Sequence, residues 1–169
     1  MCNSAGYYPV WSPTKLFASV TIAEGDGIVN QLKANGIESR YLQAIVFSHL
    51  HGDHAGGLET LVKEAPNVPI FVGDEHWNAF GKHPFWATLQ GCTPQHWPKD
   101  FAPKTLDFSD AAIGPWKQSH RIISDGKVVA VETPGHVPGH LSLIVIDLLD
   151  KEEPGGINDN PTAAFQSLK

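Results

Sequence analysis

The chain has 169 residues, of which 41% are hydrophobic and 18% charged, and its formal net charge is −6. This length and balance are typical of one soluble globular domain with a sizeable core. The negative charge argues against a nucleic-acid-binding protein, and the chain contains neither an apolar run long enough to span a membrane nor a signal-like segment.

The first periodic segments precede residue 40. A weak strand signal lies at residues 19–22, and residues 27–35 carry apolar side chains at helical spacing. Asp26 is a candidate N-cap for this helix, and Gly36 lies where a C′ glycine is expected. We therefore expect a surface helix ahead of the first well-marked strand.

An apolar strand over residues 44–47 opens into a polar loop in which three imidazoles and a carboxylate fall close together, namely His49, His51, Asp53 and His54. Imidazole nitrogen and carboxylate oxygen are ligands that zinc accepts. Alternate residues of an extended loop share a face, so several of these groups can converge. Four ligands exceed what one open tetrahedral ion requires, which suggests two metals. The alternative is a His-rich surface loop that captures metal adventitiously.

A helix over residues 55–65, stopped by Pro66, and a short buried strand over residues 69–72 follow. Residues 74–120 then combine scattered aromatics with five prolines and little periodicity. A long irregular segment of this kind is usually functional or disordered, and its aromatic content argues against disorder. We expect a partly helical cap over the metal cleft, although the aromatics could equally tie a long connection to the core.

The same segment contains four further histidines, His76, His83, His96 and His120. Their spacing does not recommend them as ligands. We interpret them as surface histidines or as core histidines with satisfied hydrogen bonds.

A hairpin is expected over residues 122–131, around the turn at Asp125 and Gly126. The chain then enters a loop rich in Pro and Gly that presents His136, and a strand over residues 141–147 follows. The alternation of helix and strand signals favours an α/β sandwich over an all-β domain.

Together the two loops resemble the metallo-β-lactamase superfamily, whose HxHxDH motif is matched by His49, His51, Asp53 and His54 and whose next ligand is matched by His136. Within this superfamily, residues 133–143 look most like the N-acyl homoserine lactone lactonase branch, although glyoxalase II-like thioesterases share much of that segment. The resemblance implies an αββα sandwich. It covers roughly residues 40–147.

The resemblance also predicts an incomplete fold. The family normally needs a longer chain, and it places a bridging aspartate, a tyrosine and a final histidine after this point. Asp147, Asp150 and Asp159 are poor matches for the aspartate, and no histidine follows His140. We therefore expect a metallo-β-lactamase-like domain over residues 1–150, incomplete at the C-terminal half, with residues 74–120 as the aromatic cap. Residues 151–169 are expected to form a flexible polar tail.

The resemblance implies a zinc-dependent hydrolase that opens lactones or cleaves related esters by metal-bound hydroxide, impaired in this short form. His49, His51 and His136 would hold the first of one or two zinc ions, and Asp53 with His54 the second; other divalent metals also fit. Asp53 would be the catalytic residue that orients the nucleophile and passes a proton to the leaving group. The alternatives are a glyoxalase II-like thioester hydrolase and a catalytically inactive metal-binding remnant.

The expected partner is a small-molecule lactone or ester, with no nucleic acid and no membrane. Cys2 and Cys92 are too few and too far apart for a disulfide framework, so we expect a reduced, cytoplasmic setting. The sequence does not indicate an oligomeric state.

Overall fold

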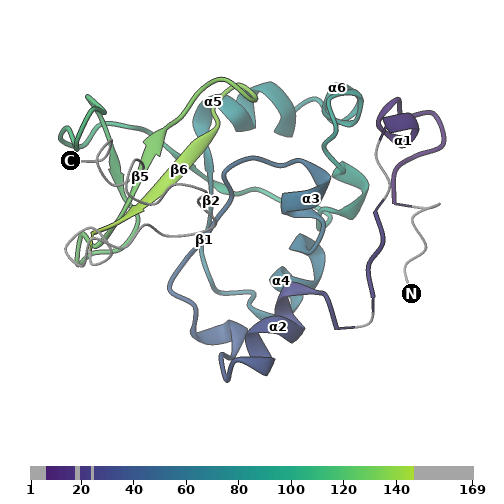
Figure 1. Ribbon diagram of the computed structural model, residues 1–169, viewed down its shortest axis with the longest axis horizontal. Helices are drawn as coiled ribbons and strands as arrows, with labels where there is room; N and C mark the ends of the chain where they lie inside the picture. The colour runs from purple at the N-terminus through teal and green to yellow at the C-terminus, as the bar shows by residue number, and fades with distance from the viewer. Residues whose placement is uncertain (1–6, 18–19, 24, 147–169) are drawn as a thin grey trace.

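The computed structural model describes residues 7–17, 20–23 and 25–146, and they form an α/β fold with two separate sheets (Figure 1). The elements in chain order are α1 (Thr14–Phe17), α2 (Ile28–Ala34), η2 (Ser39–Tyr41), β1 (Ile45–Val46), α3 (Gly52–Ala55), α4 (Leu58–Glu64), β2 (Ile70–Gly73), α5 (Asp74–His76), the π-helical turn η3 (Trp77–Gly81), α6 (Pro84–Leu89), η4 (Pro94–His96), β3 (Lys104–Leu106), β4 (His120–Arg121), β5 (Val128–Glu132) and β6 (Leu141–Val145).

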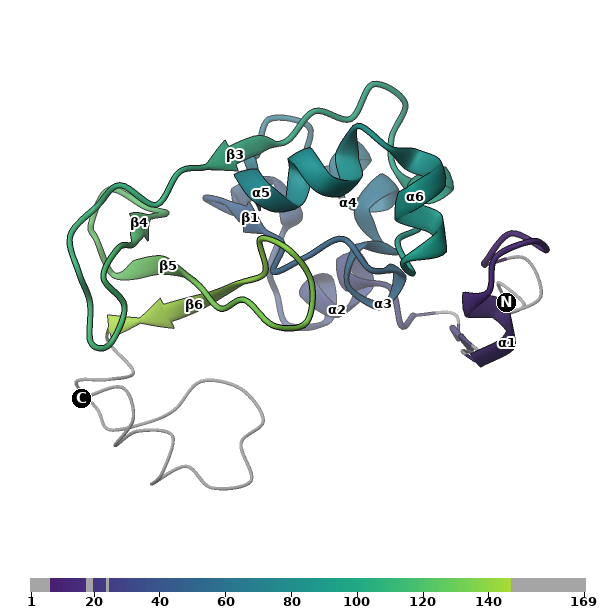
Figure 2. The same ribbon diagram turned by 90° about the horizontal axis from the view of Figure 1, so that it is seen from above.

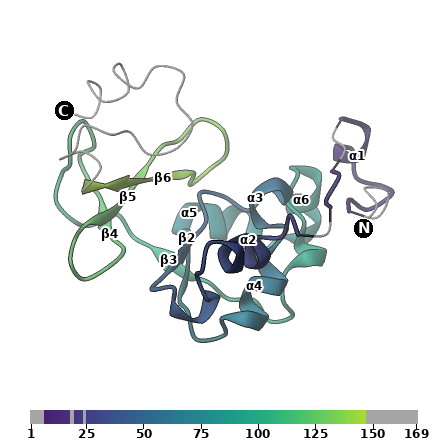
Figure 3. The same cartoon turned by 60° about the horizontal axis from the view of Figure 1, so that its bottom comes forward.

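The first sheet is parallel, with strand order β1-β2-β3. Helices α2 and α4 pack against one another beside it, as Figure 3 shows. The larger hydrophobic cluster joins this sheet to its helices, and Leu50, Leu58 and Val72 are among its fully buried members. Burial of these side chains holds the first sheet, α4 and the loop after β1 in one core.

The second sheet is antiparallel, with strand order β4-β5-β6, and it extends to one side of the first sheet and its helices (Figure 2). The two sheets meet where the backbone N–H of Leu141, at the start of β6, donates to the carbonyl of Ser48, 3.2 Å away. A smaller hydrophobic cluster of Leu106, Ala130 and Leu141 closes the junction. The loop after β1 is thereby brought beside the loop that precedes β6.

Most of the expected elements are present, with bounds that differ by a few residues; the hairpin expected over residues 122–131 is formed by β4 and β5. The helix expected over residues 27–35 is α2, and Gly36 follows it with a φ of 74°, as a C′ glycine requires. The prediction that Asp26 is the N-cap is wrong, because Gly27 holds that position. The Asp26 carboxylate instead accepts a hydrogen bond from the N–H of Ala23 at 2.7 Å. In the weak strand expected over 19–22, residue 19 lies outside the described residues and the others form no regular strand.

The helix expected over residues 55–65 is α4, which begins at Leu58, and a separate short helix, α3, precedes it. Gly56 and Gly57 separate them, and glycine is a poor helix former. The Tyr7 hydroxyl donates to the Gly52 carbonyl and lies against Gly56, where a Cβ atom would collide with it. It is therefore the short helix α3 that begins at the expected metal loop.

Residues 74–120 are partly helical, as expected, and they also supply β3, which pairs in parallel with β2. Phe80 is buried, and Trp77, Trp97 and Phe101 pack against the larger hydrophobic cluster. These aromatics tie the segment to the core. Phe85 and Trp86 remain exposed, so a contact between this segment and a substrate stays a prediction.

The expected strand over 141–147 is β6, whose last residue is Val145. Asp147, Asp150, Asp159 and the expected polar tail over 151–169 lie outside the described residues. Within the described part of the chain, no helix is both long enough and apolar enough to cross a membrane.

Candidate metal centre

The loop after β1 positions four of the predicted site residues. His49 lies in the extended segment between β1 and α3, and His51 is the N-cap residue of α3, with β-region dihedral angles and no capping bond from its side chain. Asp53 and His54 follow within the first turn of α3. The change from extended chain to helix therefore gives two imidazoles on the loop and a second pair of polar groups one turn later.

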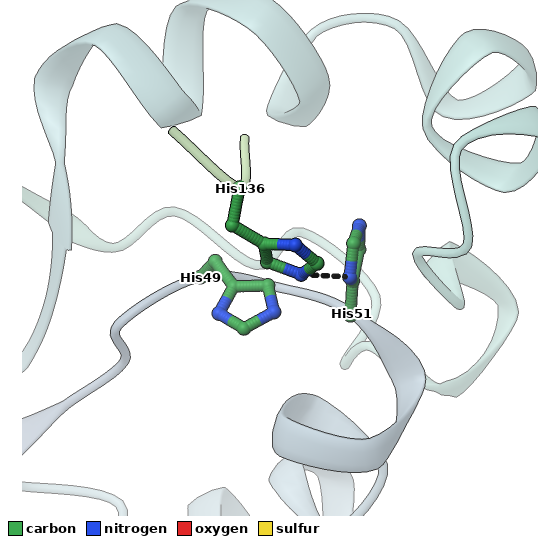
Figure 4. A group of neighbouring side chains, drawn as sticks. All are labelled: His49, His51 and His136. Atoms are coloured by element: carbon green, nitrogen blue, oxygen red, sulfur yellow. Dashed lines mark hydrogen bonds between the residues drawn. The ribbon is translucent and has the colours of Figure 1, made fainter. Parts of the chain in front are cut away.

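The loop between β5 and β6 supplies the fifth predicted residue. It closes through a bond from the Thr133 N–H to the His140 carbonyl at 2.9 Å, and glycines with positive φ lie on both sides of His136. These glycines, Gly135 at 143° and Gly139 at 63°, allow the turn that carries the His136 ring towards the other loop. Figure 4 shows His136 facing His49 and His51.

The five predicted residues fall into two groups. In the first, one ligand atom each from His49, His51 and His136 lie within 4.8 Å of one another. His136 Nε2 and His51 Nδ1 are 3.2 Å apart. In the second group, ligand atoms of His49, Asp53 and His54 meet the same limit. His49 thus belongs to both groups, which the spacing of the motif had not indicated.

Burial keeps the central imidazoles neutral. Desolvation, with the nearby imidazoles of His54 and His51, lowers the pKa of His49 to about 3. Burial and the neighbouring His136 ring also lower the pKa of His51. A neutral imidazole has a free lone pair, which is the form that binds a metal.

The nitrogens of the site fit a cation. Nε2 of His49 is buried and has no hydrogen-bond partner among the described residues. A buried polar atom without a partner costs about 1 to 3 kcal/mol, so this position is unfavourable unless something binds it. His51 faces His136 with Nδ1, while its Nε2 lies on the other side of the ring, near Gly91. Nitrogen donors of this number and kind suit zinc, and the donor set therefore fits the divalent metal that the motif implies.

His140 was not predicted as a site residue, yet its ring centroid lies 5.1 Å from that of His49. Burial lowers the pKa of His140, and its Nδ1 lies 2.9 Å from the hydroxyl of Thr133, which is in turn 2.9 Å from the hydroxyl of Ser142. The repeated Pro-Gly-His of this loop was the signal for a second histidine. His140 lines an open depression of about 420 Å³ together with His54 and Ser48.

His76 is the second residue that the sequence did not indicate as part of the site. It is fully buried, its Nε2 accepts from the Leu50 N–H at 3.0 Å, and its Nδ1 lies 2.8 Å from the Pro138 carbonyl. Since a carbonyl only accepts, Nδ1 carries the proton. Burial lowers the pKa of His76 to about 4. It is a core histidine with satisfied hydrogen bonds, as interpreted from sequence, but both of its partners lie in the ligand loops.

The comparisons with known proteins agree with the motif. Residues 11–151 match the model of the metallo-beta-lactamase superfamily. The N-acyl homoserine lactonase AttM of Azorhizobium caulinodans is 32% identical over 124 residues, which cover 72% of this chain and 43% of AttM. The N-acyl homoserine lactonase AiiA of Bacillus thuringiensis subsp. kurstaki is 31% identical over 140 residues, 80% of this chain and 44% of AiiA.

Solved structures give the same result. A crystal structure of a quorum-quenching N-acyl homoserine lactone lactonase superposes with a TM-score of 0.52 at 26% identity, covering 95% of this chain and 64% of the other. A second, of a quorum-quenching N-acyl homoserine lactone hydrolase, superposes with a TM-score of 0.51 at 27% identity, covering 88% and 59%. The chain spans less than half the length of the curated relatives named above.

Proposed function

Because the chain belongs to the metallo-beta-lactamase superfamily, we propose that it acts as a zinc-dependent hydrolase that opens lactones or cleaves related esters. The observation that carries this proposal is the convergence of His49, His51 and His136 from two loops, with a buried Nε2 of His49 that lacks a partner among the described residues. The lactone is proposed as the substrate because the relatives AttM and AiiA are named as N-acyl homoserine lactonases.

Bound zinc would polarise the ester carbonyl and lower the pKa of a water molecule. His49, His51 and His136 would hold the first ion through their ring nitrogens. Asp53 lies at the exposed side of the cluster, 3.5 Å from His54 Nε2, with 72% of its side chain accessible. From there its carboxylate would orient the attacking water and later pass a proton to the leaving alkoxide.

A second ion would be held more weakly than the first. It would depend on Asp53 and His54, whose side chains are 72% and 46% exposed, and on His49, which the first ion already uses. No carboxylate in the described part of the chain belongs to both groups. We therefore expect one tight zinc site, and slow hydrolysis because a second ion does not help to position the nucleophile.

Metal content tests the first step. Equilibrium dialysis of the 169-residue chain against zinc should give about one tightly bound equivalent, since three imidazoles and water complete an open tetrahedral site. His51→Ala should lose it. His83→Ala, which removes an exposed histidine outside both groups, is the matched control and should keep it. Less than about half an equivalent in the wild type, or full binding by His51→Ala, contradicts the proposed site.

Activity tests the second step. The zinc-loaded chain is assayed with homoserine lactones, aryl esters and lactoyl-glutathione, with and without a chelator. Slow turnover of lactones or aryl esters, abolished by the chelator and by Asp53→Ala, is the expected result. Preference for lactoyl-glutathione would assign a glyoxalase II-like thioesterase instead, and absence of turnover with zinc bound would leave a metal-binding protein without hydrolase activity.

A further inference from the structure

The two loops that carry the imidazoles are joined by a third segment, the short helix α5. His76, at its end, contacts the backbone of both loops: the N–H of Leu50, which lies between His49 and His51, and the carbonyl of Pro138, which lies between His136 and His140. These partners are 26 and 62 residues away along the chain. One buried side chain therefore links the two ligand loops.

A second bond from α5 supports this link. The Glu75 carboxylate accepts from the Gly139 N–H at 3.1 Å. Gly139 approaches so closely that a Cβ atom there would collide with the backbone nitrogen of His76, and one on Gly73 would collide with the Gly139 carbonyl. The loop between β5 and β6 is thus seated on the N-terminal turn of α5 by close backbone contact as well as by hydrogen bonds.

We propose that His76 is a positioning residue for metal binding: it holds the loop of His49 and His51 and the loop of His136 at the separation at which their nitrogens can share one ion. Its bonds end on the backbone next to the ligands and leave the ligand rings free. This inference rests on the proposed function, because it requires that the imidazoles bind zinc. Residues that orient metal ligands typically change metal affinity by about 10- to 100-fold when they are removed.

The test measures zinc affinity and the visible spectrum of the cobalt(II)-substituted protein, which reports the geometry of the ligands. His76→Leu removes both bonds and should raise the zinc Kd by about 10- to 100-fold and alter the cobalt spectrum. His76→Gln should restore both readouts towards the wild type, because a side-chain amide can accept from Leu50 and donate to Pro138 at the same time.

Two further variants separate positioning from general stability. Leu61→Ala removes a buried side chain of the same core from α4, away from both loops, and should keep the wild-type zinc Kd and cobalt spectrum even though it destabilises the fold. Glu75→Ala changes an exposed side chain, so its folding is not at risk, and should weaken zinc binding in the same direction as His76→Leu but by less.

The outcomes are distinct. If His76→Leu and Glu75→Ala bind zinc as the wild type does, or if Leu61→Ala weakens zinc binding as much as His76→Leu, the positioning role is overturned while the proposed function stands. If His76→Leu does not fold, Glu75→Ala and His76→Gln decide the question: loss in the first and retention in the second support the role, and any other combination overturns it. If the wild type binds no zinc, the proposed function fails and the inference with it.

Discussion

Two buried histidines of this protein should respond in opposite ways to the same substitution. His49 is 2% exposed and its Nε2 has no partner among the described residues, whereas His76 is fully buried and both of its nitrogens are paired. Replacing each by leucine in the metal-free protein therefore compares the stability effect of losing a candidate metal ligand with that of losing a hydrogen-bonded core histidine.

The magnitudes follow from the hydrogen bonds. In the wild type the unpaired buried nitrogen of His49 costs about 1 to 3 kcal/mol, and His49→Leu removes this cost. The substitution also loses the 3.0 Å contact of Nδ1 with the Ser48 hydroxyl, which is worth about 0.5 to 1.5 kcal/mol. The variant should therefore range from about 0.5 kcal/mol less stable to about 2.5 kcal/mol more stable than the wild type. His76→Leu leaves the buried N–H of Leu50 unpaired and should lose at least about 1 to 3 kcal/mol.

Urea unfolding followed by tryptophan fluorescence measures both changes, first with a chelator and then with zinc. At a zinc concentration about 100 times its Kd, the wild type should gain about 2.7 kcal/mol, and His49→Leu should gain none. If metal-free His49→Leu loses more than about 2 kcal/mol, or if zinc still stabilises it, then His49 is a structural histidine and the reasoning on its unpaired nitrogen is wrong.

Three further results are expected. The pKa of His76 is about 4 in the folded protein and about 6.5 in the unfolded chain, so the unfolded state binds more protons between these pH values. As the pH falls from about 6.5 to about 4, the unfolding free energy of the metal-free protein should therefore decrease, by up to about 1.4 kcal/mol per pH unit. Urea titrations at several pH values measure this decrease, which should be smaller in His76→Gln. Gly139→Ala combines a φ of 63° with a backbone collision and should lose much more stability in a thermal melt than Gly135→Ala, where no atom lies within 4 Å of the added Cβ. Burial raises the pKa of Cys92 to about 12, so in a Cys2→Ser background its thiol should react with a thiol reagent only after unfolding.

The parts of this fold that could be predicted from sequence are those set by neighbours along the chain. The apolar run before His49 gave β1, and Gly36 gave the end of α2, because hydrophobic pattern and positive φ are local properties. The proximity of Asp53 and His54 follows from the same local spacing, whereas the place of His49 in both groups does not. His136 joined the candidate site through the resemblance, since no local rule relates a loop after β5 to a loop after β1.

What could not be predicted depends on contacts between distant segments. The Tyr7 hydroxyl bonds to the carbonyl of Gly52, 45 residues away, and no local pattern indicates this contact. The pairing of β3 with β2 emerges from a segment of low periodicity, where the hydrophobic pattern gives no strand. His76 acts through backbone groups, and a backbone N–H or carbonyl is present at every residue, so no spacing of residue types could indicate those partners.

The same contacts relate metal binding to stability. The loop of His136 needs two glycines with positive φ, a close backbone approach at Gly139 and a neutral His76 between it and the other loop. Each of these features restricts the chain, and together they support an arrangement in which the buried Nε2 of His49 has no partner among the described residues. A metal-free protein therefore maintains an arrangement that is unfavourable locally and supported by the surrounding core. Zinc would compensate for the unpaired nitrogen of His49, so metal binding should add to the folding stability of this arrangement.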